Sequence, residues 1–233
     1  MKELSIITGG NSGLGYAIAV KLVAQKKNVA LIGRDADKLD KCCASLKAKG
    51  TGAEVLAFAG DISDESFAKK VFMSLAADQW GISNLFNCAG VGRFGKPEEN
   101  TREKIDIAFS ASLIGIIVMS TQAVAAMQAT GGNIINVMSS AALKGNPNET
   151  IYCAAKWGAR GYTEALKAYL KGSKTKVIGV YPGGMKTPFW NEACGMMPDT
   201  SKFMDPDEVA DEILYAVHPR TSMYVSDISV DRK

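Results

Sequence analysis

Residues 4–15, Leu4-Ser5-Ile6-Ile7-Thr8-Gly9-Gly10-Asn11-Ser12-Gly13-Leu14-Gly15, decide the fold of this chain. The first four residues predict a short buried strand, and the pattern from Tyr16 to Lys26 predicts a helix. Between them, Gly9, Gly13 and Gly15 would let the backbone turn tightly and approach a pyrophosphate at the helix N-terminus. The alternative is a glycine-rich turn that binds nothing. The candidate cofactor contacts are Gly9, Asn11, Ser12, Gly13, Leu14 and Gly15.

Beyond this unit, predicted strands and helices alternate to the end of the chain. Strands are expected at 28–32, 54–58, 84–86, 134–138, 176–181 and 223–228. Helices are expected at 36–49, from about 64, and at 97–127, 151–171 and 206–217. No linker or repeat interrupts the pattern, so we predict one α/β domain over residues 1–233. Its fold class is a single doubly wound, mainly parallel sheet (Rossmann fold) with helices on both faces.

The composition of the chain indicates which classes of binding partner to expect. The chain has 233 residues, 47% of them hydrophobic, and a net charge of +3 from 27 basic and 24 acidic residues. It has no basic block, so we expect a small-molecule substrate and neither nucleic acid nor a membrane as partner. Five cysteines without metal spacing and one histidine argue against a metal site. Free thiols, no signal-peptide pattern and an apolar run at 113–119 too short to span a bilayer favour a cytoplasmic protein.

The loops after the second and third predicted strands carry candidate cofactor contacts. Arg34 could bind a 2′-phosphate where an acidic residue would bind ribose hydroxyls, which favours NADP(H) over NAD(H). Asp35 beside it could weaken that preference. Asp61, followed by Ile62, could contact the adenine edge, although a turn or cap carboxylate explains Asp61 equally well.

Tyr152 and Lys156 stand four residues apart in a predicted helix, so their side chains should share one face. An ammonium one turn away favours the phenolate, and we expect it to lower the pKa of Tyr152, which becomes a candidate general acid. Ser139 ends a predicted buried strand, where its hydroxyl could bind a carbonyl oxygen. Together the three side chains indicate carbonyl reduction or its reverse, although Tyr-x-x-x-Lys alone is a weak signal.

The later loops complete the candidate site. Asn87-Cys88-Ala89-Gly90 is a small-residue loop that could pack closely on a cofactor. Pro182-Gly183-Gly184-Met185-Lys186-Thr187 follows the sixth predicted strand. We interpret 184–204 as a substrate lid whose aromatic and methionine side chains line an apolar pocket, although they could equally fill the core.

With these motifs in this order, the sequence resembles the short-chain dehydrogenase/reductase family over essentially its whole length. It is most similar to the shorter bacterial-type, NADP-preferring members. The matching elements are Thr8-Gly9-x-x-x-Gly13-x-Gly15, Asp61, Asn87-x-Ala89-Gly90, Ser139, Tyr152-x-x-x-Lys156, and Pro182-Gly183 with Thr187. None of them is decisive alone, but residues and spacings agree jointly.

The resemblance implies a role for each matching residue. Tyr152 would protonate the carbonyl oxygen, Ser139 would hydrogen-bond to that oxygen, and Lys156 would hold the nicotinamide ribose. Ser140 is the fallback for Ser139. The cofactor would lie along Asn87, Ala89, Gly90, Pro182, Gly183, Met185 and Thr187. The family also implies a homodimer or homotetramer packed through the helices at 97–127 and 151–171.

Three positions depart from the family pattern. Ser112 stands where the family often has a catalytic asparagine, Cys88 replaces a second asparagine, and 224–228 lacks a glycine-rich finish. We expect an NADPH-dependent reductase of a small, largely apolar carbonyl (ketone, aldehyde, diketone or pterin-like). The alternative is a non-catalytic NADP-binding sensor or regulatory protein. A dehydratase or epimerase would need acid/base groups that the sequence does not show.

Overall fold

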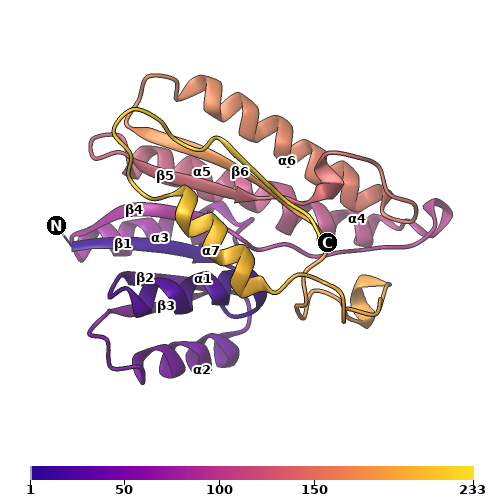
Figure 1. The fold of residues 1–233 in the computed structure, drawn as a ribbon, viewed down its shortest axis with the longest axis horizontal. Coiled ribbons are helices and arrows are strands. Elements are labelled where there is room, and N and C mark those ends of the chain that lie inside the picture. The colour runs from indigo at the N-terminus through magenta and orange to yellow at the C-terminus, as the bar shows by residue number, and fades with distance from the viewer. Residues whose placement is uncertain (1) are drawn as a thin grey trace.

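Seven parallel strands form one sheet in the computed structural model, which describes residues 2–233. Their order across the sheet is β3-β2-β1-β4-β5-β6-β7 (Figure 1). The strands are β1 (Lys2–Thr8), β2 (Asn28–Gly33), β3 (Val55–Ala59), β4 (Trp80–Asn87), β5 (Gly132–Val137), β6 (Thr175–Pro182) and β7 (Asp227–Val230). The prediction of a doubly wound, mainly parallel sheet is confirmed.

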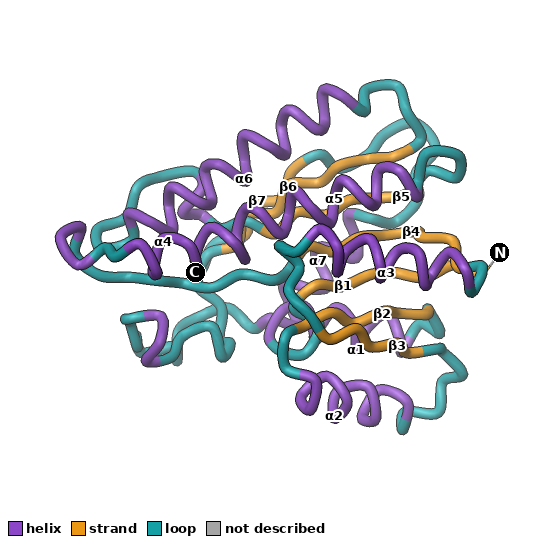
Figure 2. Tube along the Cα trace, turned by 180° about the vertical axis from the view of Figure 1, so that it is seen from behind, coloured by secondary structure: helices purple, strands orange, loops and turns teal. Residues whose placement is uncertain are grey.

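Helices cover both faces of the sheet. One face carries α1 (Gly13–Ala24), α2 (Ala36–Lys47) and α7 (Pro206–Ala216). The other carries α3 (Glu65–Ala77), α5 (Gly115–Ala126) and α6 (Thr150–Tyr169), with α4 (Arg102–Phe109) extending past the ends of the strands (Figure 2). Short 3-10 turns lie at Pro97–Glu99, Ser140–Ala142 and Glu192–Cys194.

The central strands are buried on both faces. Ile6 and Ile7 are neighbours in β1, yet they belong to different core clusters, because successive strand residues point to opposite sides. Both are fully buried. A continuous apolar run is typical of a parallel strand covered by helices on both faces.

The strand β4 is longer than the sequence predicts. It begins at Trp80 instead of residue 84, because β1 pairs with it from Lys2 onwards. Ser83 and Asn84 are polar residues that interrupt the apolar strand pattern in the sequence, and both form side-chain hydrogen bonds with β1. Ser83 Oγ donates a hydrogen bond to the Leu4 carbonyl at 3.2 Å, and Asn84 Nδ2 donates one to Ser5 Oγ at 3.0 Å.

The single helix predicted at 97–127 is broken in the structure. The Thr101 side chain caps the start of α4, and a π-helical turn at Ser110–Ile114 separates α4 from α5. The continuous run Arg102–Ala126 is long and apolar enough to cross a membrane, unlike the shorter run read from the sequence. Met119 and Ala123 of this run pack in the sheet core beside α3, and core helices share such apolar character.

Two large apolar side chains on this side of the molecule are exposed. Ile114, the last residue of the π-helical turn before α5, is 42% exposed, and Trp157 of α6 is 47% exposed. The homodimer or homotetramer expected through these segments stays a prediction.

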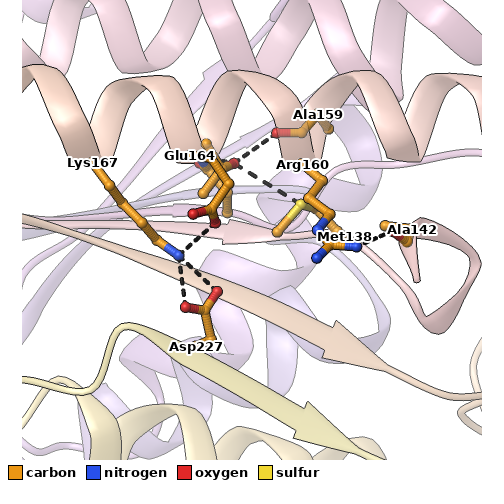
Figure 3. A network of polar contacts seen from close by, with 9 residues as sticks. Met138, Ala142, Ala159, Arg160, Glu164, Lys167 and Asp227 are labelled. Carbon is orange, nitrogen blue, oxygen red and sulfur yellow. Dashed lines mark hydrogen bonds and ion pairs between the residues drawn. The ribbon is translucent and has the colours of Figure 1, made fainter.

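An ion-pair cluster fixes the edge strand β7. Lys167 of α6 lies between Glu164 of the same helix, at 2.8 Å, and Asp227 of β7, at 2.7 Å (Figure 3). The Lys167 side chain is only 11% exposed, so water screens its pairs less than it screens a fully exposed pair. The cluster therefore links the last strand to α6.

Gly15 offers a test of how tightly the first turn of α1 packs. A Cβ atom there would lie 2.5 Å from the Gly9 carbonyl oxygen, whereas one at Gly161 of α6 would meet nothing within 4 Å. We expect Gly15→Ala to lower the free energy of unfolding by about 1–3 kcal/mol. Gly161→Ala, the control, should raise it by up to about 1 kcal/mol. Urea denaturation measures both, and equal shifts of the two midpoints would contradict the close packing.

Candidate active site

A cavity of about 700 Å³ opens at the carboxyl ends of the strands. The strand order reverses between β1 and β4, so their following loops diverge at this edge and leave a crevice. The sequence-predicted residues that line it are Gly9, Asn11, Ser12, Gly13, Leu14, Gly15, Arg34, Asp61, Ile62, Ala89, Gly90, Ser139, Tyr152, Lys156, Pro182, Gly183, Met185 and Thr187. The fold therefore brings together side chains that lie as far apart in the sequence as Gly9 and Thr187.

The glycine loop leaves the N-terminus of α1 open toward this cavity. Gly9 and Gly13 have positive φ angles of 66° and 51°, which residues with a Cβ rarely adopt. Ser12, the N-cap, makes no side-chain hydrogen bond to the first turn. Backbone N–H groups at such a helix start can bind an anion, so the loop fits the phosphates of a dinucleotide.

Two cations border the cavity beyond β2. Arg34 and Lys38 both line it, whereas Asp35 is engaged elsewhere. Asp35 Oδ1 accepts a hydrogen bond from the Lys38 backbone N–H at 3.0 Å and caps α2. The carboxylate that could have weakened a preference for a phosphate is therefore a helix cap. Sequence reasoning missed Lys38, although its place four residues after Arg34, in the first turn of a helix, was a usable signal.

Asp61 is a turn carboxylate that also lies at the cavity wall. Its Oδ1 accepts hydrogen bonds from the Ser63 backbone N–H at 2.8 Å and from Ser63 Oγ at 2.7 Å, as a turn carboxylate does. It also lines the cavity. The hydrogen bonds within this turn therefore hold the Asp61 carboxylate at the cavity wall.

Ser139, Tyr152 and Lys156 border the same part of the cavity. Tyr152 and Lys156 lie one turn apart on α6, with Lys156 Nζ 5.7 Å from the centre of the Tyr152 ring. Lys156 is buried, and its Nζ donates a hydrogen bond to the Val137 carbonyl at 3.1 Å. Ser139 is in extended conformation just after β5, and its Oγ accepts a hydrogen bond from the Ala141 N–H at 3.1 Å.

The expected lowering of the Tyr152 pKa by Lys156 is not what this structure indicates. Burial raises the pKa of Tyr152 well above its ordinary value, while hydrogen bonding with Ser139 acts in the lowering direction. Nearby Glu149 raises it further. Burial also lowers the pKa of Lys156 to about 8, so the ammonium is itself destabilised. Tyr152 is therefore held in its protonated form, which an acid requires.

The side chain of Asn87 does not line the cavity, contrary to the expectation that it lies along a cofactor. It is fully buried, and its Nδ2 donates hydrogen bonds to Ser120 Oγ at 3.1 Å and Asn136 Oδ1 at 2.9 Å. These bonds join β4 to α5 and β5 behind the cavity wall. Among the described residues, its Oδ1 is a buried side-chain atom without a hydrogen-bond partner. Asn87 is thus placed to hold the strand ends together.

Ser112, at the position of the family's asparagine, lies in the π-helical turn and is fully buried. Its Oγ is 3.5 Å from the Val91 N and 3.4 Å from the Val91 O. Ser112 therefore contacts the backbone of the loop that follows β4, and it is not itself among the residues lining the cavity.

Aromatic side chains form an apolar wall that the sequence indicated only in part. Phe189, Trp190 and Phe203 come from the predicted lid, and Phe94 comes from the loop after β4. The Phe94 and Tyr152 ring centres are 5.4 Å apart in an edge-to-face arrangement. Phe189 and Trp190 also pack against a small core cluster, so these two side chains both line the cavity and contribute to core packing. Met197 is 69% exposed and does not contribute to the wall.

The lowered pKa of Lys156 predicts a pH dependence of stability. Between pH 8 and 10 an unfolded chain keeps this lysine protonated while the folded chain loses its proton, so stability should rise with pH. We expect wild type to gain about 1–3 kcal/mol of unfolding free energy over this range relative to Lys156→Met. Urea denaturation at several pH values measures the difference. Parallel pH profiles of the two proteins would show that the lysine pKa is unshifted.

The comparisons with known proteins agree with this geometry. The sequence model of the short chain dehydrogenase family matches residues 3–196. Sepiapterin reductase of Chlorobaculum tepidum is 29% identical over 236 residues, covering 98% of this chain and 95% of its relative. Carbonyl reductase family member 4 of Xenopus tropicalis is 29% identical, covering 92% and 91% of the two chains.

A solved structure is similar over the same extent. The crystal structure of a short-chain dehydrogenase/reductase from Vibrio parahaemolyticus matches with a TM-score of 0.85 and 33% identity. The match covers 98% of this chain and 96% of that one. With the family model, the relatives and the fold in agreement, this chain belongs to the short-chain dehydrogenase/reductase family of oxidoreductases.

Proposed function

We propose that this chain is an NADPH-dependent carbonyl reductase that converts a small, largely apolar ketone, aldehyde, diketone or pterin-like carbonyl to an alcohol. The observation that carries the proposal is that Ser139, Tyr152 and Lys156 border one cavity together with the glycine loop of α1. The names of the two relatives, a sepiapterin reductase and a carbonyl reductase, support a carbonyl as the group reduced.

NADP(H) is the proposed cofactor, and it would supply the hydride when bound. The open N-terminus of α1 would bind its phosphate bridge, and Arg34 with Lys38 would bind the 2′-phosphate. Asp61 and Ile62 would lie beside the adenine. Ala89, Gly90, Gly183, Met185 and Thr187 would lie along the remainder of the molecule.

Tyr152 is the proposed general acid. Its phenol stays protonated because of burial, and it would donate that proton to the carbonyl oxygen as negative charge develops there. The Ser139 hydroxyl would donate a second hydrogen bond to the same oxygen. Lys156, held by the Val137 carbonyl, would stabilise the tyrosinate left after proton transfer and hold the nicotinamide ribose.

The segment 184–204 is the proposed substrate lid. Phe189, Trp190 and Phe203 line the cavity from this segment, so a substrate would bind beneath an apolar surface. Excluding water there would strengthen the hydrogen bonds from Ser139 and Tyr152 to the carbonyl.

The role of Tyr152 can be tested by Tyr152→Phe. The variant lacks the proton donor, so we expect carbonyl reduction to fall roughly a hundredfold or more while NADPH binding stays nearly unchanged. Tyr162→Phe, on the same helix but outside the cavity lining, is the matched control and should keep its activity.

The assay follows NADPH oxidation against a diketone, aromatic aldehydes, a quinone, an aliphatic keto ester and sepiapterin. Retained turnover in Tyr152→Phe would remove this residue from the role. Tight NADPH binding by wild type without reduction of any of these compounds would instead favour the non-catalytic sensor.

The role of Arg34 can be tested by Arg34→Ala. If its guanidinium binds the 2′-phosphate, the dissociation constant for NADPH should rise about tenfold or more and that for NADH by less than about threefold. Lys41→Ala removes an exposed cation of the same helix region outside the cavity and should change neither constant. Equal weakening of NADPH and NADH by Arg34→Ala would refute the assignment.

A further inference from the structure

Arg232, two residues after β7, lines the cavity. Its guanidinium carbon lies 4.6 Å from the centre of the Phe203 ring. Within residues 2–233 it forms no ion pair with a carboxylate and no hydrogen bond to another group. A guanidinium stacked on an aromatic face keeps its N–H groups free at the edge, where they can bind an anion.

The strand that precedes Arg232 is held in place by contacts at both of its ends. The Gly183 N–H donates a hydrogen bond to the Val230 carbonyl at 2.8 Å, two residues before Arg232. The start of the same strand is held by Lys167, as Figure 3 shows. In the two opposite views the C-terminus lies beside the segment that joins β6 to α7 (Figures 1 and 2). The backbone therefore holds Arg232 near the lid.

A continuous row of aromatic rings connects Tyr152 with Arg232. Phe94 lies 5.4 Å from Tyr152 and 5.7 Å from Trp190, measured between ring centres. Trp190 lies 5.4 Å from Phe203, on which Arg232 stacks. A flat or apolar molecule bound along this row would have its reducible carbonyl at one end and a guanidinium at the other.

The charges around the cavity favour one orientation of such a molecule. Glu149 lies near enough to Tyr152 to raise its pKa, so a second anion is unfavourable at that end. Asp106 is paired with Arg102, and Arg93 Nη1 donates a hydrogen bond to the Gly92 carbonyl. Among the described cations that line the cavity, Arg232 is thus the one with unpaired donors at the lid end of the aromatic row.

We propose that Arg232 is a specificity-determining residue that binds a substrate carboxylate, so that the preferred substrates are apolar or aromatic carbonyl compounds carrying a carboxylate distant from the reacting group. A planar carboxylate matches the two parallel N–H donors of a guanidinium. This inference rests on the proposed function, because it assigns the substrate class of that same site.

The experiment compares aryl ketones with and without the charge. The probes are 4-acetylbenzoate and 4-(4-acetylphenyl)butanoate, which place the carboxylate at two distances, and the methyl ester of each. Wild type should reduce at least one acid with a kcat/KM about tenfold or more above that of its ester. Arg232→Gln should lower kcat/KM for that acid about tenfold or more, mainly through a higher KM. It should change kcat/KM for the corresponding ester less than about twofold.

Arg220→Gln is the matched control. Arg220 is also stacked on an aromatic ring, 4.9 Å from the centre of Tyr215, but lies outside the cavity lining. The Arg220→Gln variant should reduce both acids and esters with the kcat/KM values of wild type. The NADPH dissociation constant of Arg232→Gln should equal that of wild type. If Arg232→Gln instead binds NADPH more weakly and loses kcat/KM equally for acid and ester, Arg232 binds the cofactor. That result would overturn the proposal.

A binding measurement separates failure of this inference from failure of the proposed function. Isothermal titration of acids and esters into the NADP⁺-loaded protein, which cannot reduce a ketone, reports on Arg232 whether or not turnover is seen with NADPH. Preferential binding of an acid that Arg232→Gln abolishes would support the carboxylate site while rejecting the reductase. Equal binding of acid and ester by wild type and Arg232→Gln would overturn the carboxylate site whether or not turnover occurs.

Discussion

The parallel pairing of β1 with β4 is the constraint on which the rest of the structure depends. It runs from Lys2 opposite Trp80 to Thr8 opposite Asn87, so both strands end at the same level. The following loops then meet closely, and a Cβ atom on Gly9 would lie only 3.0 Å from the Ala89 backbone. Thr8 Oγ1 accepts a hydrogen bond from the Ala89 N–H at 3.1 Å, which fixes this contact. The glycine loop, the cavity and the row of site residues all follow from this shared edge.

The site itself works against the stability of the molecule. Tyr152 and Lys156 are polar side chains buried on a helix where apolar ones would cost less to desolvate. The fold accommodates Lys156 by giving its ammonium the Val137 carbonyl, which lies at the end of β5. The lysine of the proposed catalytic pair is thus positioned by an ordinary backbone group, and the shifted pKa values of Tyr152 and Lys156 result mainly from burial.

Much of this arrangement could be predicted from the sequence, because it depends on local pattern. The glycine loop and the strand–helix alternation fix the sheet, and parallel strands necessarily bring their following loops to one edge. The sequence indicates which aromatic residues belong to the proposed lid. It does not indicate how their rings are oriented, because their packing depends on Phe94 from a distant loop. The inward position of Asn87 and the placement of Arg232 depend on tertiary hydrogen bonds and strand ends. No local spacing encodes those contacts.

The π-helical turn at Ser110–Ile114 has a geometric consequence for the helices it joins. Each residue of an α-helix advances the side-chain direction by about 100°, and a wide turn accommodates an extra residue at this point. The faces of α4 and α5 are therefore offset from each other around the common axis. The α5 segment can keep Met119 and Ala123 against the sheet while α4 presents a separate face to α6. The run Arg102–Ala126 thus presents differently directed faces before and after the π-helical turn, which a regular α-helix of this length could not do.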